Sequence, residues 1–443
     1  MRKSIKFLSI GILLSSFLSS CQNVDNSSFI FSSKSSSTSN SITSSAIVTS
    51  SSMQNNSSSE VNNTISSSDS VVHTSSSSMI SSSQQSSTSV ISSSTSVISS
   101  SSVVSSSAVS SSTPTIEENK ELKVIAIEMK GTYGDSYLVK YDNFEMLVDA
   151  GTTYDKSYVQ AALTEFVEDD ELDILMVSHL HADHIGSMTS TSFFTGIGIS
   201  VNTIVDPGTS PTTATARNYE SMRNSLVNKG TQYYNYYNII NDSSISTKWY
   251  IDQEKDIFIE FFNSGSVAKP NTAPSELNES SIAFSICYQN NKWFFGGDIP
   301  TSTESTLVDN IKKINNEYFK ESDHVVMKSC HHGSNGSNSD KLISFVKPDI
   351  VFIMAGIIEK NKNNQAITSQ HPYLNALNRL KKQTTKVYWS SINGLSIFSS
   401  TGNEVSFDAR GRTVDYYYNG SKVSRDSERY STIFESKWYS MMK

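Results

Sequence analysis

Six consecutive residues, His-Leu-His-Ala-Asp-His, bring three imidazoles and one carboxylate together in the chain. They follow the apolar run 174–177, which is typical of a buried strand. His179 and His181 lie two positions apart at the strand end and can face one point, while Asp183 and His184 open the next element and face a second point. Imidazole and carboxylate ligands suit Zn²⁺, with manganese and iron as alternatives. The spacing therefore predicts a site for two divalent metal ions.

Strand and helix patterns alternate on both sides of this motif. Strands are predicted at residues 122–129, 136–141, 144–149, 173–177, 201–205, 257–262, 282–288, 292–295, 325–329, 350–354, 386–389 and 395–398. Helices are predicted at residues 155–168, 213–228, 303–314 and 372–382. Such interleaving indicates an α/β fold in which helices cover the sheet.

The first quarter of the chain has a different composition. Serine occupies 18 of the 30 positions between 81 and 110, and no Lys or Arg occurs between Lys34 and Lys120. A tract of this kind buries too little apolar surface to offset the conformational entropy of ordering its backbone. We therefore expect a disordered Ser-rich linker at 22–115 and one folded domain at 116–443.

The charge of the predicted domain bears on its partners. Residues 116–443 contain 31 basic and 40 acidic side chains, a formal net charge of −9. A dedicated duplex-DNA binder normally carries a basic surface instead. The composition therefore disfavours that class of protein.

The N-terminus has the features of a targeting segment. Arg2, Lys3 and Lys6 precede a short apolar run at 7–18, which is too brief to span a membrane. Leu-Ser-Ser-Cys at 18–21 resembles the lipobox of bacterial lipoproteins, and this resemblance implies a lipid on Cys21 and a place on the outer face of a bacterial membrane. The linker would then act as a tether of about 55 Å r.m.s. length. The alternative is an ordinary secretory signal.

The motif also resembles the H-x-H-x-D-H signature of the metallo-β-lactamase fold superfamily. Within it, the chain is similar to the hydrolase domain of ComEC-type DNA-uptake proteins and to surface phosphorylcholine esterases. The similar segments are Gly134-Asp135-Ser136, 147–151, Asn278-Glu279-Ser280-Ser281, 294–298, Lys328-Ser329-Cys330-His331-His332-Gly333-Ser334 and His371-Pro372. Their order implies a metallo-β-lactamase αββα sandwich and two divalent metal ions, with zinc expected first.

The resemblance also assigns roles to residues. It implies that His179 and His181 bind the first metal, that Asp183 and His184 bind the second, and that Asp298 bridges both. Either His331 or His332 is implied to complete the second site, and the sequence leaves both candidates open. The histidine that does not bind metal is expected to hydrogen-bond a substrate oxygen. Catalytic roles are expected for Asp183, Asp298 and His332. Asp135 and Asp149 are expected to orient ligands rather than to bind metal.

The sequence departs from the superfamily pattern at three places. No histidine occurs between Ile185 and Asp323, where most members supply a third ligand to the first metal, and Asn278 is the nearest equivalent. His181 stands where ComEC-type domains usually have Asp, as in the esterase branch. The late Thr-Asp pair of the group is Ser390-Ser391 here. The first metal site is therefore expected to be the weaker one.

Two further segments have alternative interpretations. The loop 333–336 could offer backbone N–H groups to a phosphate, or it could be an ordinary Gly/Ser/Asn turn. The tyrosines of 233–237 could stack on a substrate, although half-buried packing is favoured.

The function predicted from these features is that of a surface-tethered, dinuclear-metal hydrolase acting on phosphodiesters of nucleic acid or nucleotides. The alternatives are a phosphorylcholine or other small-ester hydrolase, and a non-catalytic surface adhesin on the same fold. No protein partner is implied.

Overall fold

The computed structural model of the chain describes residues 120–130, 133–274, 276–356, 371–413, 416–418, 421–424 and 426–442. The predicted signal peptide, Cys21 and the Ser-rich linker lie outside these residues. None of the helices in the described ranges combines the length and the hydrophobicity that crossing a bilayer would require.

Two large sheets form the centre of the domain. The first has the order β15 (Ser406–Ala409), β14 (Ser396–Ser400), β1 (Leu122–Ala126), β2 (Tyr137–Tyr141), β3 (Phe144–Val148), β4 (Glu171–Met176), β5 (Ser200–Asp206) and β6 (Gln232–Asn235). The second has the order β13 (Val387–Trp389), β12 (Ile350–Ile353), β11 (His324–Lys328), β10 (Asn291–Phe295), β9 (Ala283–Tyr288), β8 (Ile257–Phe262) and β7 (Lys248–Asp252). A small hairpin pairs β16 (Tyr416–Tyr418) with β17 (Ser421–Val423).

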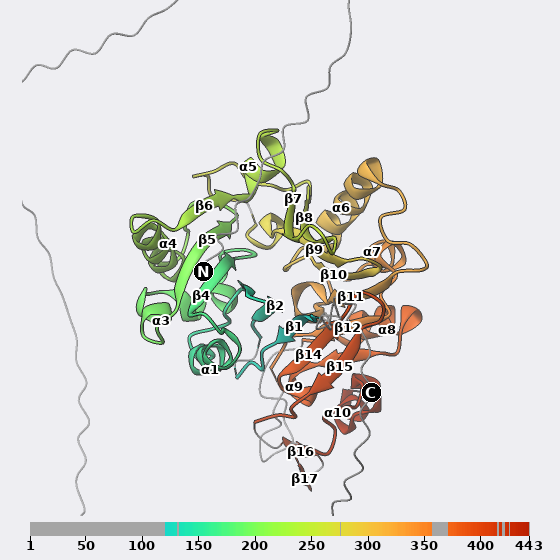
Figure 1. Cartoon of the computed structure of the whole chain (residues 1–443). Coiled ribbons are helices and arrows are strands. Elements are labelled where there is room, and N and C mark those ends of the chain that lie inside the picture. Colours follow the sequence, from blue (N-terminus) through green and yellow to red (C-terminus); the bar gives the residue numbers. More distant parts are fainter. Residues whose placement is uncertain are drawn as a thin grey trace, which may run out of the picture. The chain divides into compact units, whose positions relative to one another are not determined.

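Helices lie on the outer faces of both sheets (Figure 1). The α-helices are α1 (Lys156–Phe166), α2 (Ala182–Ile185), α3 (Ser192–Thr195), α4 (Ala214–Val227), α5 (Tyr236–Asn241), α6 (Thr301–Ile314), α7 (Asp340–Val346), α8 (Leu374–Gln383), α9 (Ser390–Asn393) and α10 (Lys437–Met442). Short 3₁₀ turns are η1 (Gly186–Met188), η2 (Asn278–Ser280), η3 (Cys330–Gly333) and η4 (Ile433–Glu435). Helices α1, α3 and α4 accompany the first sheet, and α6, α7 and α8 accompany the second (Figure 1). The structure thus confirms the predicted α/β class and the αββα sandwich of the metallo-β-lactamase fold.

The core follows from the alternation of side chains along each strand. On β10, Trp293 and Phe295 belong to the apolar cluster shared with the first sheet, whereas Phe294 belongs to the cluster under α6, α7 and α8. Both faces of this strand are therefore covered, which explains why its last three residues are all apolar.

Most predicted elements are present, and their ends differ by a few residues. The predicted strand 122–129 ends at Ala126, and the predicted helix 372–382 runs over Leu374–Gln383. Strands β6, β7 and β15 were not predicted, because their exposed or half-buried polar side chains weaken the apolar signal.

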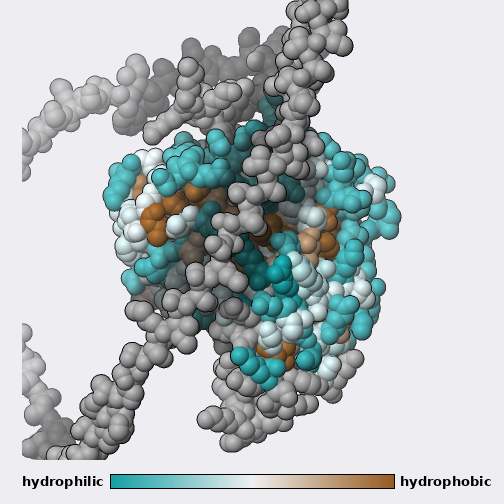
Figure 2. Space-filling view, turned by 60° about the horizontal axis from the view of Figure 1, so that its bottom comes forward, coloured by the Kyte–Doolittle hydropathy of each residue, from teal (hydrophilic) through white to brown (hydrophobic). Residues whose placement is uncertain are grey.

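The tyrosines of 233–237 take part in packing, as favoured. Tyr236 is fully buried, and Tyr234 packs against Trp249 with ring centroids 5.1 Å apart. The Tyr233 hydroxyl donates to Asp206 Oδ1 at 2.7 Å. The exposed face in Figure 2 is mostly hydrophilic, with hydrophobic side chains in small groups.

Candidate metal centre

The histidine motif lies at the carboxyl end of β4, where parallel strands commonly place binding residues. The strand ends at Met176, and after a short loop that carries His179 and His181 the chain enters the short helix α2 at Ala182. Nε2 of His179 and Nδ1 of His181 face each other at 3.0 Å. Two imidazole nitrogens this close can share one proton or direct both lone pairs at a cation. The predicted first site therefore has a preformed pair of nitrogen donors.

Asp298 reaches the same region from the second sheet, directly after β10. Gly297 precedes it with a φ of 54°, and a Cβ at that position would lie 2.7 Å from the Cβ of Ser281. Glycine is needed there because only it combines this conformation with such close packing. The Asp298 N–H donates to Ser281 Oγ at 3.1 Å, so the backbone of this carboxylate is fixed.

The histidine pair lies on the turn η3 after β11. Both residues have positive φ values, 47° for His331 and 51° for His332, a conformation that non-glycine residues rarely adopt. Such backbone strain is concentrated at functional sites. The turn separates the two imidazoles: His332 is 1% exposed and points into the cluster, whereas His331 lines a neighbouring pocket.

Ligand atoms of a second group converge opposite the first pair. His184 Nε2 lies 3.3 Å from Asp298 Oδ2. His332 Nε2 lies 3.1 Å from the same oxygen and 3.3 Å from Asp183 Oδ2. The structure therefore brings Asp183, His184, Asp298 and His332 together, and of the pair that the sequence left open, His332 is the one that lies in this cluster.

Neighbouring acceptors fix the orientation of two imidazoles. Nδ1 of His332 donates to the Met354 carbonyl at 2.7 Å, so Nδ1 carries a proton and Nε2 is the nitrogen that would offer a lone pair to a cation. Nδ1 of His184 lies 2.8 Å from Asp149 Oδ2. Asp149 also accepts from the backbone N–H of Ser178 at 2.7 Å and from its hydroxyl at 2.6 Å. Carboxylates and carbonyls commonly orient metal-binding histidines in this way.

Asp135, which was expected to orient ligands, and Lys328, for which the sequence predicted no role, lie beside the site. The carboxylate of Asp135 is close enough to His184, Asp298 and His332 to count as a fourth potential ligand. The ammonium of Lys328 is also buried there, 2.5 Å from Asp135 Oδ2 and 3.0 Å from Asp298 Oδ1. Asp135 and Lys328 do stand in the motifs quoted above, but local spacing does not reveal that their side chains meet.

Opposite charges in the cluster shift its pKa values. Burial raises the pKa of Asp298, but His332, Lys328 and His184 outweigh burial and hold it well below its usual range. Burial lowers the pKa of His332, but Asp298 and Asp135 outweigh burial and raise it well above its usual range. For His179, burial and His184 outweigh the opposing effects of Asp298 and Asp183, and its pKa is held well below its usual range.

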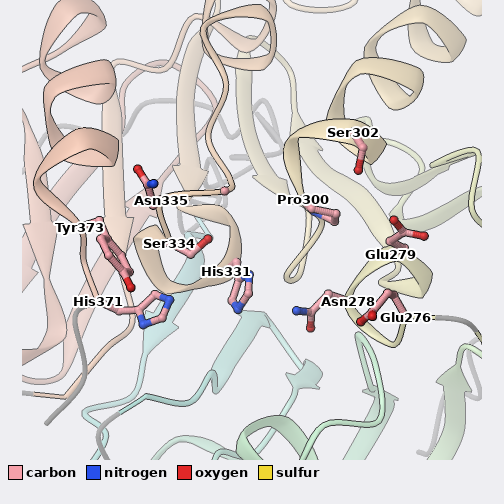
Figure 3. Close-up of a pocket in the computed structure, with 11 residues that line it drawn as sticks. Glu276, Asn278, Glu279, Pro300, Ser302, His331, Ser334, Asn335, His371 and Tyr373 are labelled. Atoms are coloured by element: carbon pink, nitrogen blue, oxygen red, sulfur yellow. The ribbon is translucent and has the colours of Figure 1, made fainter.

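A pocket of about 440 Å³ opens next to the cluster. His331 lies in its middle, His371 and Tyr373 lie on one side, and Asn278, Glu276 and Glu279 lie on the other (Figure 3). The rings of His331 and His371 stack with centroids 5.5 Å apart. Burial, followed by His332 and His331, lowers the pKa of His371 to about 4. The pocket thus presents two imidazoles that are neutral at pH 7.

Asn278 and the loop 333–336 complete the pocket. Oδ1 of Asn278 is buried and forms no hydrogen bond within the described residues. Ser334, Asn335 and Gly336 also line the pocket. The Arg379 guanidinium supports this loop, because it donates to the carbonyls of Asn335 and Ser337 at 2.9 and 2.7 Å. The loop is therefore a fixed wall of the pocket.

The donor set fits divalent cations. His332 Nε2 is buried without hydrogen-bond geometry to any described group, and it faces two carboxylate oxygens. The other predicted ligands also direct imidazole nitrogens or carboxylate oxygens into this region. Such mixed nitrogen and oxygen sets are typical of zinc and of other first-row divalent metals.

One family model matches part of the chain. Residues 126–332 match a family model described as "Anti-Pycsar protein Apyc1", a range that includes all seven residues predicted as ligands. No curated protein matches the sequence.

Similar solved structures include YhfI, a metallo-β-lactamase fold protein of Bacillus subtilis, with 13% identity over 60% of this chain and 95% of that chain, at a TM-score of 0.36. A diphosphatase of the PhnP family has 13% identity over 53% of this chain and 86% of that chain, at a TM-score of 0.27. The short form of human tRNase Z has 12% identity over 60% of this chain and 92% of that chain, at a TM-score of 0.30.

Proposed function

We propose that this chain, which has the metallo-β-lactamase fold, is a dinuclear-metal hydrolase that acts on phosphodiesters of nucleic acid or nucleotides. The proposal is carried by one observation: side chains from the ends of β4, β10 and β11, far apart in the sequence, converge with their ligand atoms facing one another. His179 and His181 would hold the first cation. Asp183, His184 and His332 would hold the second, and Asp298 would serve both.

The bound cations would supply an activated water and would polarise a phosphoryl oxygen on the phosphorus under attack. The chain's own groups have separate roles. Asp183 is partly exposed and can take a proton from water that enters the site. His331 and His371 lie in the pocket, where they can hydrogen-bond the phosphoryl oxygen or the leaving group.

A phosphorylcholine ester is the second candidate substrate. Glu276 and Glu279 form an acidic wall of the pocket, across from the ring of Tyr373. Carboxylates and an aromatic ring are groups that bind quaternary ammonium. The same wall would repel the neighbouring phosphate of a polynucleotide.

We further propose that a lipid on Cys21 anchors the enzyme outside a bacterial membrane, with 22–115 as its tether. A Cys21→Ser variant is expected to appear in the culture medium, while the wild type stays with the membrane fraction. Equal membrane association of both proteins would contradict lipid anchoring and would favour another mode of retention.

Metal analysis combined with a substrate panel tests the enzymatic proposal. The purified protein is expected to retain more than one transition metal ion per chain and to hydrolyse bis(p-nitrophenyl) phosphate, and Asp183→Ala should lose both properties. Assays with DNA, cyclic dinucleotides and phosphorylcholine esters then rank the substrates. A wild type that retains no metal and hydrolyses none of these compounds would instead support a non-catalytic adhesin.

A further inference from the structure

A lysine side chain lies buried behind the metal-binding cluster. Lys328 is the last residue of β11, and its side chain is 1% exposed. Lysine is almost never fully buried unless it is paired, because an ammonium group loses strong hydration on burial. Specific partners must therefore maintain this position.

The ammonium lies among three oxygens. Nζ donates to Asp298 Oδ1 at 3.0 Å and to the Gly297 carbonyl at 2.7 Å, and it forms an ion pair with Asp135 Oδ2 at 2.5 Å. Two carboxylates and a carbonyl thus compensate the buried charge. Lys328 thus links Asp135, in the loop between β1 and β2, to Gly297 and Asp298 after β10.

Contact with Lys328 makes the two oxygens of Asp298 unequal. Oδ1 accepts from the ammonium, while Oδ2 is the oxygen near His184 Nε2 and His332 Nε2. A cation in the cluster would meet Oδ2, because Oδ1 already has a positive neighbour.

Contact with Lys328 also occupies Asp135. Oδ2 of Asp135 faces the ammonium, and Oδ1 accepts from the Tyr137 hydroxyl at 3.0 Å. By distance alone Asp135 belongs with His184, Asp298 and His332 as a potential ligand. Its oxygens instead lie on the Nδ1 side of both rings, 3.8 Å from Nδ1 of His184 and 3.4 Å from Nδ1 of His332, whereas the Nε2 atoms face Asp298 Oδ2.

We propose that Lys328 is a positioning residue that decides which carboxylate oxygens of the cluster bind metal. It reserves Asp298 Oδ2 for the metal ions and keeps both Asp298 Oδ1 and Asp135 Oδ2 from binding them. This role rests on the proposed function of the site.

Replacement of Lys328 by methionine tests the role, because methionine keeps the length of the side chain and removes its charge. Two further carboxylate oxygens then become available to a bound cation. Hydrolysis is expected to fall about 10- to 100-fold, the range typical of groups that orient ligands. Bound Co²⁺ is expected to gain oxygen ligands, which lowers its visible absorption intensity.

A second variant separates positioning from folding. Asp135→Asn combined with Lys328→Met removes one of the released carboxylates, so most of the lost Co²⁺ absorption should return. Lys292→Met is the matched control, because Lys292 on β10 is also a mostly buried lysine and pairs with Asp323, the residue before β11. It should leave the Co²⁺ spectrum unchanged.

A Lys328→Met protein with the wild-type Co²⁺ spectrum and activity would overturn the role, as would a double variant that recovers none of the absorption. If Lys328→Met does not fold, the double variant is compared directly with the wild type, and its Co²⁺ absorption must come close to that of the wild type. A wild type that binds Co²⁺ but hydrolyses no phosphodiester would refute the proposed substrate class and leave the Lys328 test intact. A wild type that binds no Co²⁺ would refute both.

Discussion

Asp149→Asn should weaken metal binding at the second site without disturbing the fold. Asp149 is 1% exposed, and its carboxylate accepts from His184 Nδ1 and from both polar groups of Ser178. Asparagine can keep the bond from the Ser178 N–H, and it tolerates the φ of 55° found there. However, an amide NH₂ facing His184 would favour the tautomer with its proton on Nε2, which then has no lone pair for a metal.

The structure gives the size of the effect. Loss of an orienting carboxylate usually costs 10- to 100-fold in metal affinity, or about 1.4 to 2.7 kcal/mol. The metal-free protein should change less, because the hydrogen bond lost to His184 is offset by the removal of a buried carboxylate whose pKa is raised by burial. The variant should therefore unfold near the wild-type temperature without metal and gain less stability when metal is added.

Competition titration with a chromophoric chelator measures the affinity, and thermal unfolding with and without Zn²⁺ measures the stability. Asp206→Asn is the control, because Asp206 is equally buried but is paired with Arg223 at 2.8 Å outside the cluster. It should lower the unfolding temperature and leave the metal affinity unchanged. Wild-type metal affinity in Asp149→Asn would refute the orienting role of this carboxylate.

Three other changes have expected outcomes. Burial raises the pKa of Asp173 from 3.8 to about 6, so the folded state releases its proton at a higher pH than the unfolded state, and the stability that this group contributes is lost as the pH rises from 4 to 6. In thermal unfolding, Asp173→Asn should be more stable than the wild type at pH 7 and equally stable below pH 4. A difference that does not change with pH would contradict this expectation. In Gly186→Ala the new Cβ would lie 2.8 Å from the Thr153 backbone nitrogen, so calorimetry should show a loss of about 1 to 3 kcal/mol, whereas Gly336→Ala, with no atom within 4 Å, should show none. His371→Ala should lower kcat/KM about tenfold, the equivalent of one hydrogen bond, with unchanged metal content, and loss of metal would indicate that His371 is a ligand instead.

Local patterns in the sequence were sufficient for much of the fold. The short apolar runs 293–295 and 325–327 identified β10 and β11, because strands covered on both faces carry apolar residues at successive positions. Strands with polar exposed faces, such as β7, escaped the same reasoning. The His179-to-His184 motif could likewise be interpreted alone, because its members are neighbours in the chain.

Sequence by itself determined the ligand types and the order of the elements, since these depend on local composition and spacing. Tertiary structure alone decided between His331 and His332, because the positive φ values of η3 send the two side chains to different sides. It also placed Lys328 between Asp135 and Asp298. Whether a buried charge is neutralised depends on groups from distant strands, and the strength of that interaction falls with a separation that only the folded chain defines.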